Sequence, residues 1–220
     1  VLSKESLLEI IEVAKKHALW IISDEAYEDI LYKPYKHYSI ASLARDYANR
    51  VISIFSFSKS HAMSGLRLGY IVTTSNIMQE RLPKILRCVV NGANSITQWA
   101  GITAIQKDHA YIDMMRSEYE VRRDVIYAAL SEVPDIKLFR PQGSFFIWIE
   151  LESAVYDRLG CKNTDEISDY LAKLGLGSIP GQAFGNSNIH SIRFAYSCDT
   201  EMVKQGSLIL RDALMGHKLQ

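Results

Sequence analysis

Apolar side chains recur at helical spacing near the start of the chain. Leu7, Ile10, Ile11 and Ala14 stand at positions i, i+3, i+4 and i+7, so they form one face of an expected helix. Short apolar runs follow, without the alternation of polar and apolar positions that a half-exposed strand shows. Such runs favour a parallel or mixed sheet that helices cover on both faces. We predict strands over residues 19–23, 51–57 and 68–73.

The pattern becomes helical from about Asn76 and mixed after Pro134. A periodic stretch over residues 111–130 predicts a long helix that links two domains. We expect an α/β fold in two parts: residues 1–113 with a mixed, mostly parallel sheet between helices, and residues 114–220 as a small α+β domain. In the second part we predict strands over residues 136–139, 144–151 and 189–195 and helices over residues 164–174 and 200–214.

The charge balance limits the partners that the chain can have. It carries 25 basic and 25 acidic side chains. Nucleic acids and anionic membranes both attract a basic surplus, so we expect neither as a partner. The three cysteines include no C-x-x-C pair and the six histidines lack metal-ligand spacing. We therefore expect no metal site, no disulfide framework and a reducing, cytoplasmic setting.

Polar residues concentrate where two of the expected strands end. Asp24 and Tyr27 follow the first strand, and Lys59 follows the second, with Arg67 eight residues later. Ligands of open α/β sheets bind beyond the carboxyl ends of strands, so we expect these side chains to face one cleft. Taken singly, each has an ordinary explanation as a solvated lysine, a turn carboxylate, a half-buried tyrosine or half of a surface salt bridge. Their order and positions together favour a binding site.

The side chains of this cleft suit four different functional groups. Lys59 supplies an amine that forms an imine with an aldehyde. Arg67 offers a planar fork to phosphate oxygens, and two serines, Ser56 and Ser58, complete an anion cradle. Asp24 offers a carboxylate to a protonated ring nitrogen, and Tyr27 offers a phenol to a ring oxygen. An aldehyde, a phosphate, a pyridinium nitrogen and a ring oxygen together describe pyridoxal 5′-phosphate (PLP).

The segment around Lys59 is similar to a known motif. Residues 56–70, Ser-Phe-Ser-Lys-Ser-His-Ala-Met-Ser-Gly-Leu-Arg-Leu-Gly-Tyr, closely resemble the lysine signature of class I/II aminotransferases, of fold type I. The resemblance implies that Lys59 holds PLP as a Schiff base and that Ser56 and Arg67 bind the phosphate.

Other segments resemble the same family. Residues 24–27 resemble its Asp-x-x-Tyr, which implies that the aspartate holds the pyridine nitrogen and the tyrosine the ring oxygen. Residues 180–185 look like its Pro-Gly-x-x-Phe-Gly turn, and residues 190–195 look like the strand whose arginine, here Arg193, grips the substrate α-carboxylate. The resemblance covers nearly the whole chain. It implies amino acid and 2-oxo acid substrates, a homodimer for the full-length protein, and residues 1–113 as the C-terminal part of the large PLP-binding domain.

The start of the chain departs from the family pattern. The chain begins with Val1, and the family's Asn-Pro-x-Gly turn, Gly/Ser-rich phosphate loop and ring-stacking aromatic are not found in it. We expect these parts on roughly 150 to 180 residues upstream, since two-domain chains of this kind exceed the usual single-domain size. Without them we expect an incomplete PLP site and no activity.

Other functions share the same motif. Fold type I also includes lyases that cleave C–S bonds with the same set of residues, and some transcriptional regulators carry an aminotransferase-like domain as a PLP-dependent sensor. The intact Lys59, Asp24 and Arg67 argue against a non-catalytic relative. Residues 91–97 contain no arginine, where some dicarboxylate-specific relatives carry one, and the sequence leaves the donor amino acid open.

Overall fold

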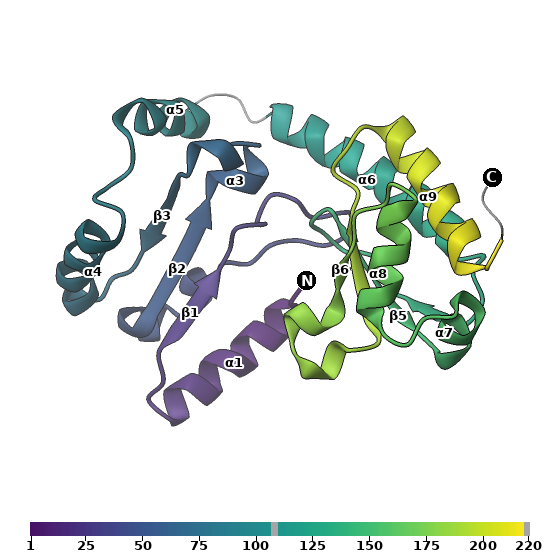
Figure 1. The fold of residues 1–220 in the computed structure, drawn as a ribbon. Coiled ribbons are helices and arrows are strands. Elements are labelled where there is room, and N and C mark those ends of the chain that lie inside the picture. The colour runs from purple at the N-terminus through teal and green to yellow at the C-terminus, as the bar shows by residue number, and fades with distance from the viewer. Residues whose placement is uncertain (107–109, 218–220) are drawn as a thin grey trace. The chain divides into compact units, whose positions relative to one another are not determined.

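The computed structural model describes residues 1–106 and 110–217 (Figure 1). The chain divides into two compact units, Val1–Asp113 and Met114–Gln220, and the division falls within the long helix α6 (Ala110–Leu130). Over the described ranges, no helix combines the length and the apolar character needed to cross a bilayer.

A three-stranded mixed sheet organises the first unit. Its strands are β1 (Ile21–Asp24), β2 (Val51–Ser56) and β3 (Gly69–Val72), in the spatial order β1-β2-β3. β1 and β2 run parallel, whereas β3 is antiparallel to β2. The predicted α/β class with a mixed sheet is therefore confirmed.

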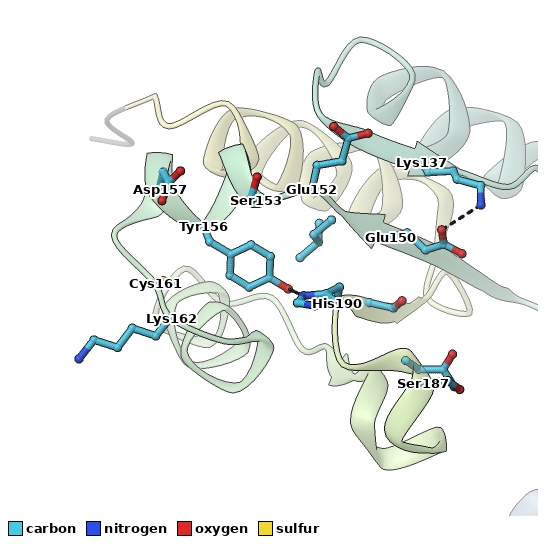
Figure 2. A pocket seen from close by; sticks show the side chains of 13 residues that line it. Lys137, Glu150, Glu152, Ser153, Tyr156, Asp157, Cys161, Lys162, Ser187 and His190 are labelled. Carbon is cyan, nitrogen blue, oxygen red and sulfur yellow. Dashed lines mark hydrogen bonds and ion pairs between the residues drawn. The ribbon is translucent and has the colours of Figure 1, made fainter.

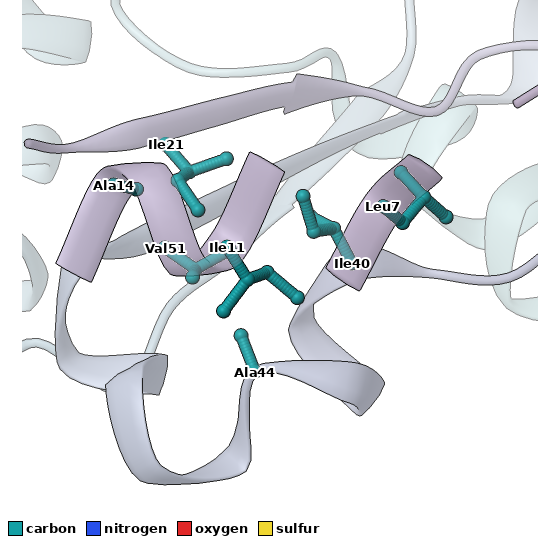
Figure 3. Close-up of a cluster of buried hydrophobic side chains, with 7 residues drawn as sticks. All are labelled: Leu7, Ile11, Ala14, Ile21, Ile40, Ala44 and Val51. Atoms are coloured by element: carbon teal, nitrogen blue, oxygen red, sulfur yellow. The ribbon is translucent and has the colours of Figure 1, made fainter. Parts of the chain in front are cut away.

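Helix α1 (Lys4–Lys16) covers one face of this sheet. It begins where the Ser3 hydroxyl accepts a hydrogen bond from the Ser6 N–H at 3.1 Å. Its apolar face packs against β1, β2 and the short helix α2 (Ile40–Leu43). The buried side chains of this cluster, drawn in Figure 3, are Leu7, Ile11, Ala14, Ile21, Ile40, Ala44 and Val51.

Ile10 lies outside this cluster, although the sequence pattern placed it on the buried face. It is 42% exposed, whereas Ile11 is 1% exposed. Successive helical residues are rotated by about 100°, so Ile10 stands at the edge of the face that Leu7, Ile11 and Ala14 form. The buried face of α1 is therefore narrower than the set of apolar positions that the sequence placed on it.

We expect Ile11→Ala to lower the free energy of unfolding by about 2–5 kcal/mol, because it removes buried apolar atoms and leaves a cavity. Ile10→Ala is the matched control on the neighbouring residue, and it should change that free energy by no more than about 0.5 kcal/mol. Urea unfolding followed by circular dichroism measures both variants. Equal losses in the two variants would contradict the observed packing.

The first unit also carries further helices and several exposed apolar side chains. The helices are α3 (Phe57–Ser60), α4 (Asn76–Val89) and α5 (Ser95–Gln106). Short 3-10 segments cover Arg45–Arg50 and Ser64–Leu66. Large apolar side chains on β1, β3 and α5 stay exposed among the described residues, including Ile22, Val72, Ile96 and Trp99.

A four-stranded antiparallel sheet organises the second unit. Its strands follow the spatial order β4 (Ile136–Leu138), β5 (Phe146–Leu151), β7 (Ser191–Ala195) and β6 (Ile179–Pro180). The helices are α7 (Ser153–Leu159), α8 (Thr164–Lys173) and α9 (Thr200–Leu214), with most of α6. Every second residue of β5 is buried, so one face of this sheet forms the core.

Candidate active site

Three strand ends meet at one edge of the first sheet. Asp24, the last residue of β1, lies opposite Ile54 of β2, and the Glu25 N–H donates to the Ile54 carbonyl at 2.8 Å. Ser56, the last residue of β2, lies opposite Gly69, the first residue of β3. The carboxyl ends of β1 and β2 therefore share an edge with the amino end of β3 (Figure 1). All six residues that the sequence assigned to the cofactor lie at these strand ends or within a few residues of them.

Lys59 and Tyr27 come together at this edge. Ser56 caps α3, with its hydroxyl accepting from the Ser58 N–H at 3.1 Å, and buried Phe57 anchors the single turn. This turn directs Lys59 toward the neighbouring strand end. The Lys59 Nζ atom lies 5.7 Å from the centre of the Tyr27 ring. The amine from helix α3 and the phenol from the turn after β1 thus approach one another.

The segment after β1 forms a tight turn around Asp24. Its Oδ1 atom accepts a hydrogen bond from the Ala26 N–H at 3.1 Å. The Glu28 N–H donates to the Glu25 carbonyl, and the Ile30 N–H donates to the Tyr27 carbonyl. The Asp24 carboxylate stays exposed, so it is available to a positively charged partner.

Arg67 occupies a conformation that few residues other than glycine adopt. Its φ is +54°, in the left-handed region, and one guanidinium N–H donates to the Ser64 carbonyl at 2.9 Å. The neighbouring chain is fixed by the Phe57 N–H, which donates to the Leu68 carbonyl at 3.2 Å. Strain of this kind clusters at ligand sites. Leu68 directly follows Arg67, so the hydrogen bond that its carbonyl accepts ties the Arg67 segment to the start of the Ser56–Lys59 turn.

An ion pair between buried Glu25 and the more exposed His37 supports the Asp24 turn. Glu25 is 4% exposed, and its carboxylate accepts from His37 Nε2 at 2.8 Å and from the Ser39 hydroxyl at 3.2 Å. Burial alone would raise the pKa of Glu25, but these hydrogen bonds outweigh it and hold the pKa below its usual value. The bond to Glu25 raises the pKa of His37. The twelve-residue separation of this pair gives no periodic signal in the sequence.

These shifts set the pH range in which the pair stabilises the fold. Because the pKa of His37 is raised, its contribution is complete below the unfolded-state value of about 6.5 and is lost as the pH rises through the folded-state value. Because the pKa of Glu25 is lowered, its contribution is present above about 4.5 and is lost as the pH falls through the folded-state value. The pair therefore contributes most between these two limits.

We expect His37→Gln to destabilise the fold by about 1–3 kcal/mol near pH 5.5, since it leaves a buried carboxylate with a weaker donor. The difference from the wild-type chain should shrink as the pH rises through the raised pKa of His37, because the wild-type histidine then also becomes neutral. Urea unfolding across this range measures the difference. The matched control is His17→Gln, at an exposed histidine, which should show no such trend. A difference in stability that stays constant at all pH values would show that the charge of His37 does not stabilise the fold.

Arg193, the residue assigned to the substrate carboxylate, lies in the second unit. It stands on β7, opposite Trp148 of β5 and Ile179 of β6. Its guanidinium carbon lies 4.1 Å from the centre of the Phe146 ring and 4.5 Å from that of Phe184. Among the described residues, no carboxylate or carbonyl accepts a hydrogen bond from this half-buried guanidinium. A charge held in this way is suited to an anion from outside the chain.

A separate pocket of about 870 Å³ lies within the second unit (Figure 2). Tyr156 and His190 meet across it, with the Tyr156 hydroxyl 3.3 Å from His190 Nδ1, and Lys137 pairs with Glu150 at 3.0 Å. Burial raises the pKa of Tyr156. Arg193 does not line this pocket, so the pocket is distinct from the proposed carboxylate site. Over the described part of the chain, no group of three or more histidine, cysteine or acidic side chains is placed to hold a metal ion.

A protein-family model matches most of the length of this chain. Residues 1–207 match the family model described as aminotransferase class I and II. The chain belongs to this family. The resemblance carried by residues 56–70 is thereby confirmed, and the cofactor of this family is PLP.

Individual relatives agree with this membership. The chain is 30% identical over 220 residues to an aspartate aminotransferase of Pyrococcus horikoshii, covering 99% of this chain and 54% of the relative. It is 30% identical over 206 residues to an aspartate aminotransferase of a Bacillus species, covering 93% and 52%. A solved aromatic aminotransferase of Pyrococcus horikoshii superposes with a TM-score of 0.87 at 30% identity, covering 97% and 56%. The chain spans about half the length of these relatives.

The residues at the sheet edge fit the functional groups of PLP. The Lys59 amine and the Tyr27 ring lie together, as a reactive aldehyde carbon and a neighbouring ring oxygen would require. The exposed Asp24 carboxylate at the adjoining strand end suits a protonated ring nitrogen. The serine turn and Arg67 supply hydroxyl, N–H and guanidinium donors of the kind that a phosphate accepts.

Proposed function

We propose that the protein that carries this chain transfers an amino group between an amino acid and a 2-oxo acid, with PLP as cofactor. The observation that carries the proposal is the approach of Lys59 to Tyr27 beside the end of β1, where Asp24 lies. The aspartate aminotransferases among the relatives support amino transfer over C–S bond cleavage. They also make aspartate the first donor to test.

Lys59 has two tasks in this proposal. Its amine would hold PLP through a covalent link, and the same amine would move the proton at the substrate Cα. PLP, when bound, supplies an electron sink for the substrate carbon. The Asp24 carboxylate would favour the protonated form of the ring nitrogen, and a protonated ring accepts electron density from the substrate carbon more readily. Tyr27 donates a hydrogen bond to the ring oxygen.

The remaining site residues bind anionic groups. Ser56, Ser58 and Arg67 hold the phosphate through hydroxyl, backbone N–H and guanidinium donors. Arg193 binds the substrate α-carboxylate through its planar fork, which orients the Cα–H bond. Its aromatic surroundings and the absence of an acceptor among the described residues support this role.

The proposed organisation of the whole protein follows the family. Residues 1–113 are the C-terminal part of the large PLP-binding domain, and residues 114–220 are the small C-terminal domain, in agreement with the two compact units. The exposed apolar side chains on β1, β3 and α5 support contact with further polypeptide, including a second subunit of a homodimer. The cysteines Cys88, Cys161 and Cys198 are free, which supports a cytoplasmic setting.

The decisive experiment uses the purified protein that carries this chain, loaded with PLP and supplied with aspartate. Formation of oxaloacetate beyond one equivalent per bound PLP should require a second 2-oxo acid, such as 2-oxoglutarate, and in this steady state one glutamate should appear for each oxaloacetate. Release of a 2-oxo acid with ammonia in the absence of an acceptor would instead indicate a lyase. Failure of any amino acid to react with any acceptor would refute the proposed activity.

A further inference from the structure

The guanidinium of Arg193 is held by two aromatic rings from different parts of the second unit. Phe146 is the first residue of β5 and shares a sheet face with Trp148, the residue opposite Arg193. Phe184 ends the short 3-10 segment Gly181–Phe184, far along the chain from β5. Both ring centres lie within 4.5 Å of the guanidinium carbon. The Phe184 ring also packs edge-on against Trp148, at 5.4 Å between ring centres.

The turn that carries Phe184 is fixed at both of its ends. Pro180 pairs with Ile192 in the sheet, and a Cβ on Gly181 would overlap the carbonyl oxygens of Asn188 and Ser191, so only glycine fits there. At the other end the Phe184 carbonyl accepts a hydrogen bond from the Asn188 side chain at 3.2 Å. Close packing against the start of β7 thus presents the ring at the position of Arg193.

We propose that Phe184 is a positioning residue for carboxylate binding: together with Phe146 it holds the Arg193 guanidinium so that its N–H edge faces an incoming carboxylate. This inference rests on the proposed role of Arg193 and adds a function for the Pro-Gly-x-x-Phe-Gly turn, residues 180–185, which the catalytic scheme leaves unexplained. The ligand class is a carboxylate, as in the α-carboxylate of an amino acid.

Two physical effects link the rings to carboxylate binding. Aromatic rings attract a guanidinium through their faces, which leaves the donors in the guanidinium plane free for the two parallel bonds of a carboxylate. The rings also exclude water from part of the guanidinium, and an ion pair is stronger where water is excluded. Contact with the two rings also restricts the Arg193 side chain before a ligand binds, so less conformational entropy is lost on binding.

Phe184→Leu tests the proposal, because it removes the aromatic face and keeps an apolar side chain. In the PLP-loaded protein we expect the KM for the amino acid donor to rise roughly 2- to 30-fold, the range of a cation–π contact, with a much smaller change in kcat. Calorimetric titration with succinate, which has carboxylates and no amino group, should show a weakening of the same size without any turnover. Phe184→Tyr keeps the aromatic face and should restore both values.

The matched control is Phe139→Leu. Phe139 is 45% exposed, against 42% for Phe184, and it contacts a different cation, with Lys137 Nζ 4.7 Å from its ring centre. It should leave succinate binding unchanged. Unaltered succinate binding in Phe184→Leu, no recovery in Phe184→Tyr, or an equal loss in Phe139→Leu would each overturn the positioning role.

Arg193→Gln separates this inference from the function on which it rests. If this variant loses succinate affinity and Phe184→Leu keeps it, the carboxylate role of Arg193 stands and the role of Phe184 is rejected. If Arg193→Gln binds succinate as the wild type does, the assignment of Arg193 is itself wrong, and the inference falls with it. Circular dichroism confirms that each variant is folded.

Discussion

Replacing Lys59 with alanine is expected to abolish covalent attachment of PLP and to slow amino transfer by at least about 10²–10⁴-fold, the usual contribution of a positioned general acid–base group. The Lys59 amine is the group that the α3 turn brings to the Tyr27 ring, at 5.7 Å from its centre. Reduction of the PLP-loaded protein with borohydride, followed by peptide mass analysis, measures attachment directly. The wild-type peptide that contains residue 59 should carry the mass of the reduced cofactor, and the variant peptide should not.

The control for this experiment is Lys36→Ala, at an exposed lysine of the same unit. It should keep both the cofactor mass on the Lys59 peptide and the wild-type rate. Retention of borohydride-fixed cofactor by Lys59→Ala, at any other lysine, would show that Lys59 is not the point of attachment. A fully active Lys59→Ala protein would remove the residue from catalysis as well.

The second large effect is expected for Asp24→Asn. Asparagine keeps an oxygen for the hydrogen bond from the Ala26 N–H, so the turn after β1 should stay folded. It removes the negative charge that would face a protonated ring nitrogen, and the loss of one such preorganised interaction costs about 10²–10³-fold in kcat. Steady-state rates at saturating aspartate and 2-oxoglutarate measure this effect.

Glu28→Gln is the matched control, because it neutralises a carboxyl group in the same turn. Burial and the charge of Asp29 raise the pKa of Glu28 to about 7, so this group is already partly neutral at neutral pH. We expect less than about a tenfold change in kcat from the control. Comparable losses in the two variants would mean that general disturbance of the turn, rather than the charge of Asp24, is responsible.

The boundaries of several elements depend on backbone features that the apolar pattern does not record. The strand expected over residues 19–23 begins only at Ile21, because Ala18 has a φ of +52° and the Leu19 N–H still donates to the Ala14 carbonyl at the end of α1. The strand expected from residue 144 begins at Phe146, since Ser144 has a φ of +63°. Residues in the left-handed region cannot continue an extended strand.

The sequence predicted one helix with its exact bounds and failed to predict two short elements. Helix α9 has the bounds that its apolar spacing indicated, Thr200–Leu214, and it begins where the Asp199 side chain accepts from the Met202 N–H. The short helix α7 and the two-residue strand β6 were not expected. About two helical turns or one pair of residues are too short for a hydrophobic period to appear.

The site was accessible from the sequence to the extent that its residues lie next to strand ends. Asp24, Tyr27 and Lys59 follow apolar runs directly, and the parallel pairing of β1 and β2 brings those ends to one edge. The Glu25–His37 pair and the two phenylalanines around Arg193 had no such marker. Contacts of this kind join residues far apart in the chain.

The sequence by itself determined the α/β class, the aminotransferase family and the residue types that suit PLP, because strand periods and a long motif are local properties of the chain. Only the tertiary structure decided which side chains meet: the lysine over the tyrosine ring, the buried carboxylate with its histidine, and the arginine between aromatic rings. These contacts depend on strand register and loop packing, and those are fixed when distant segments exclude water together.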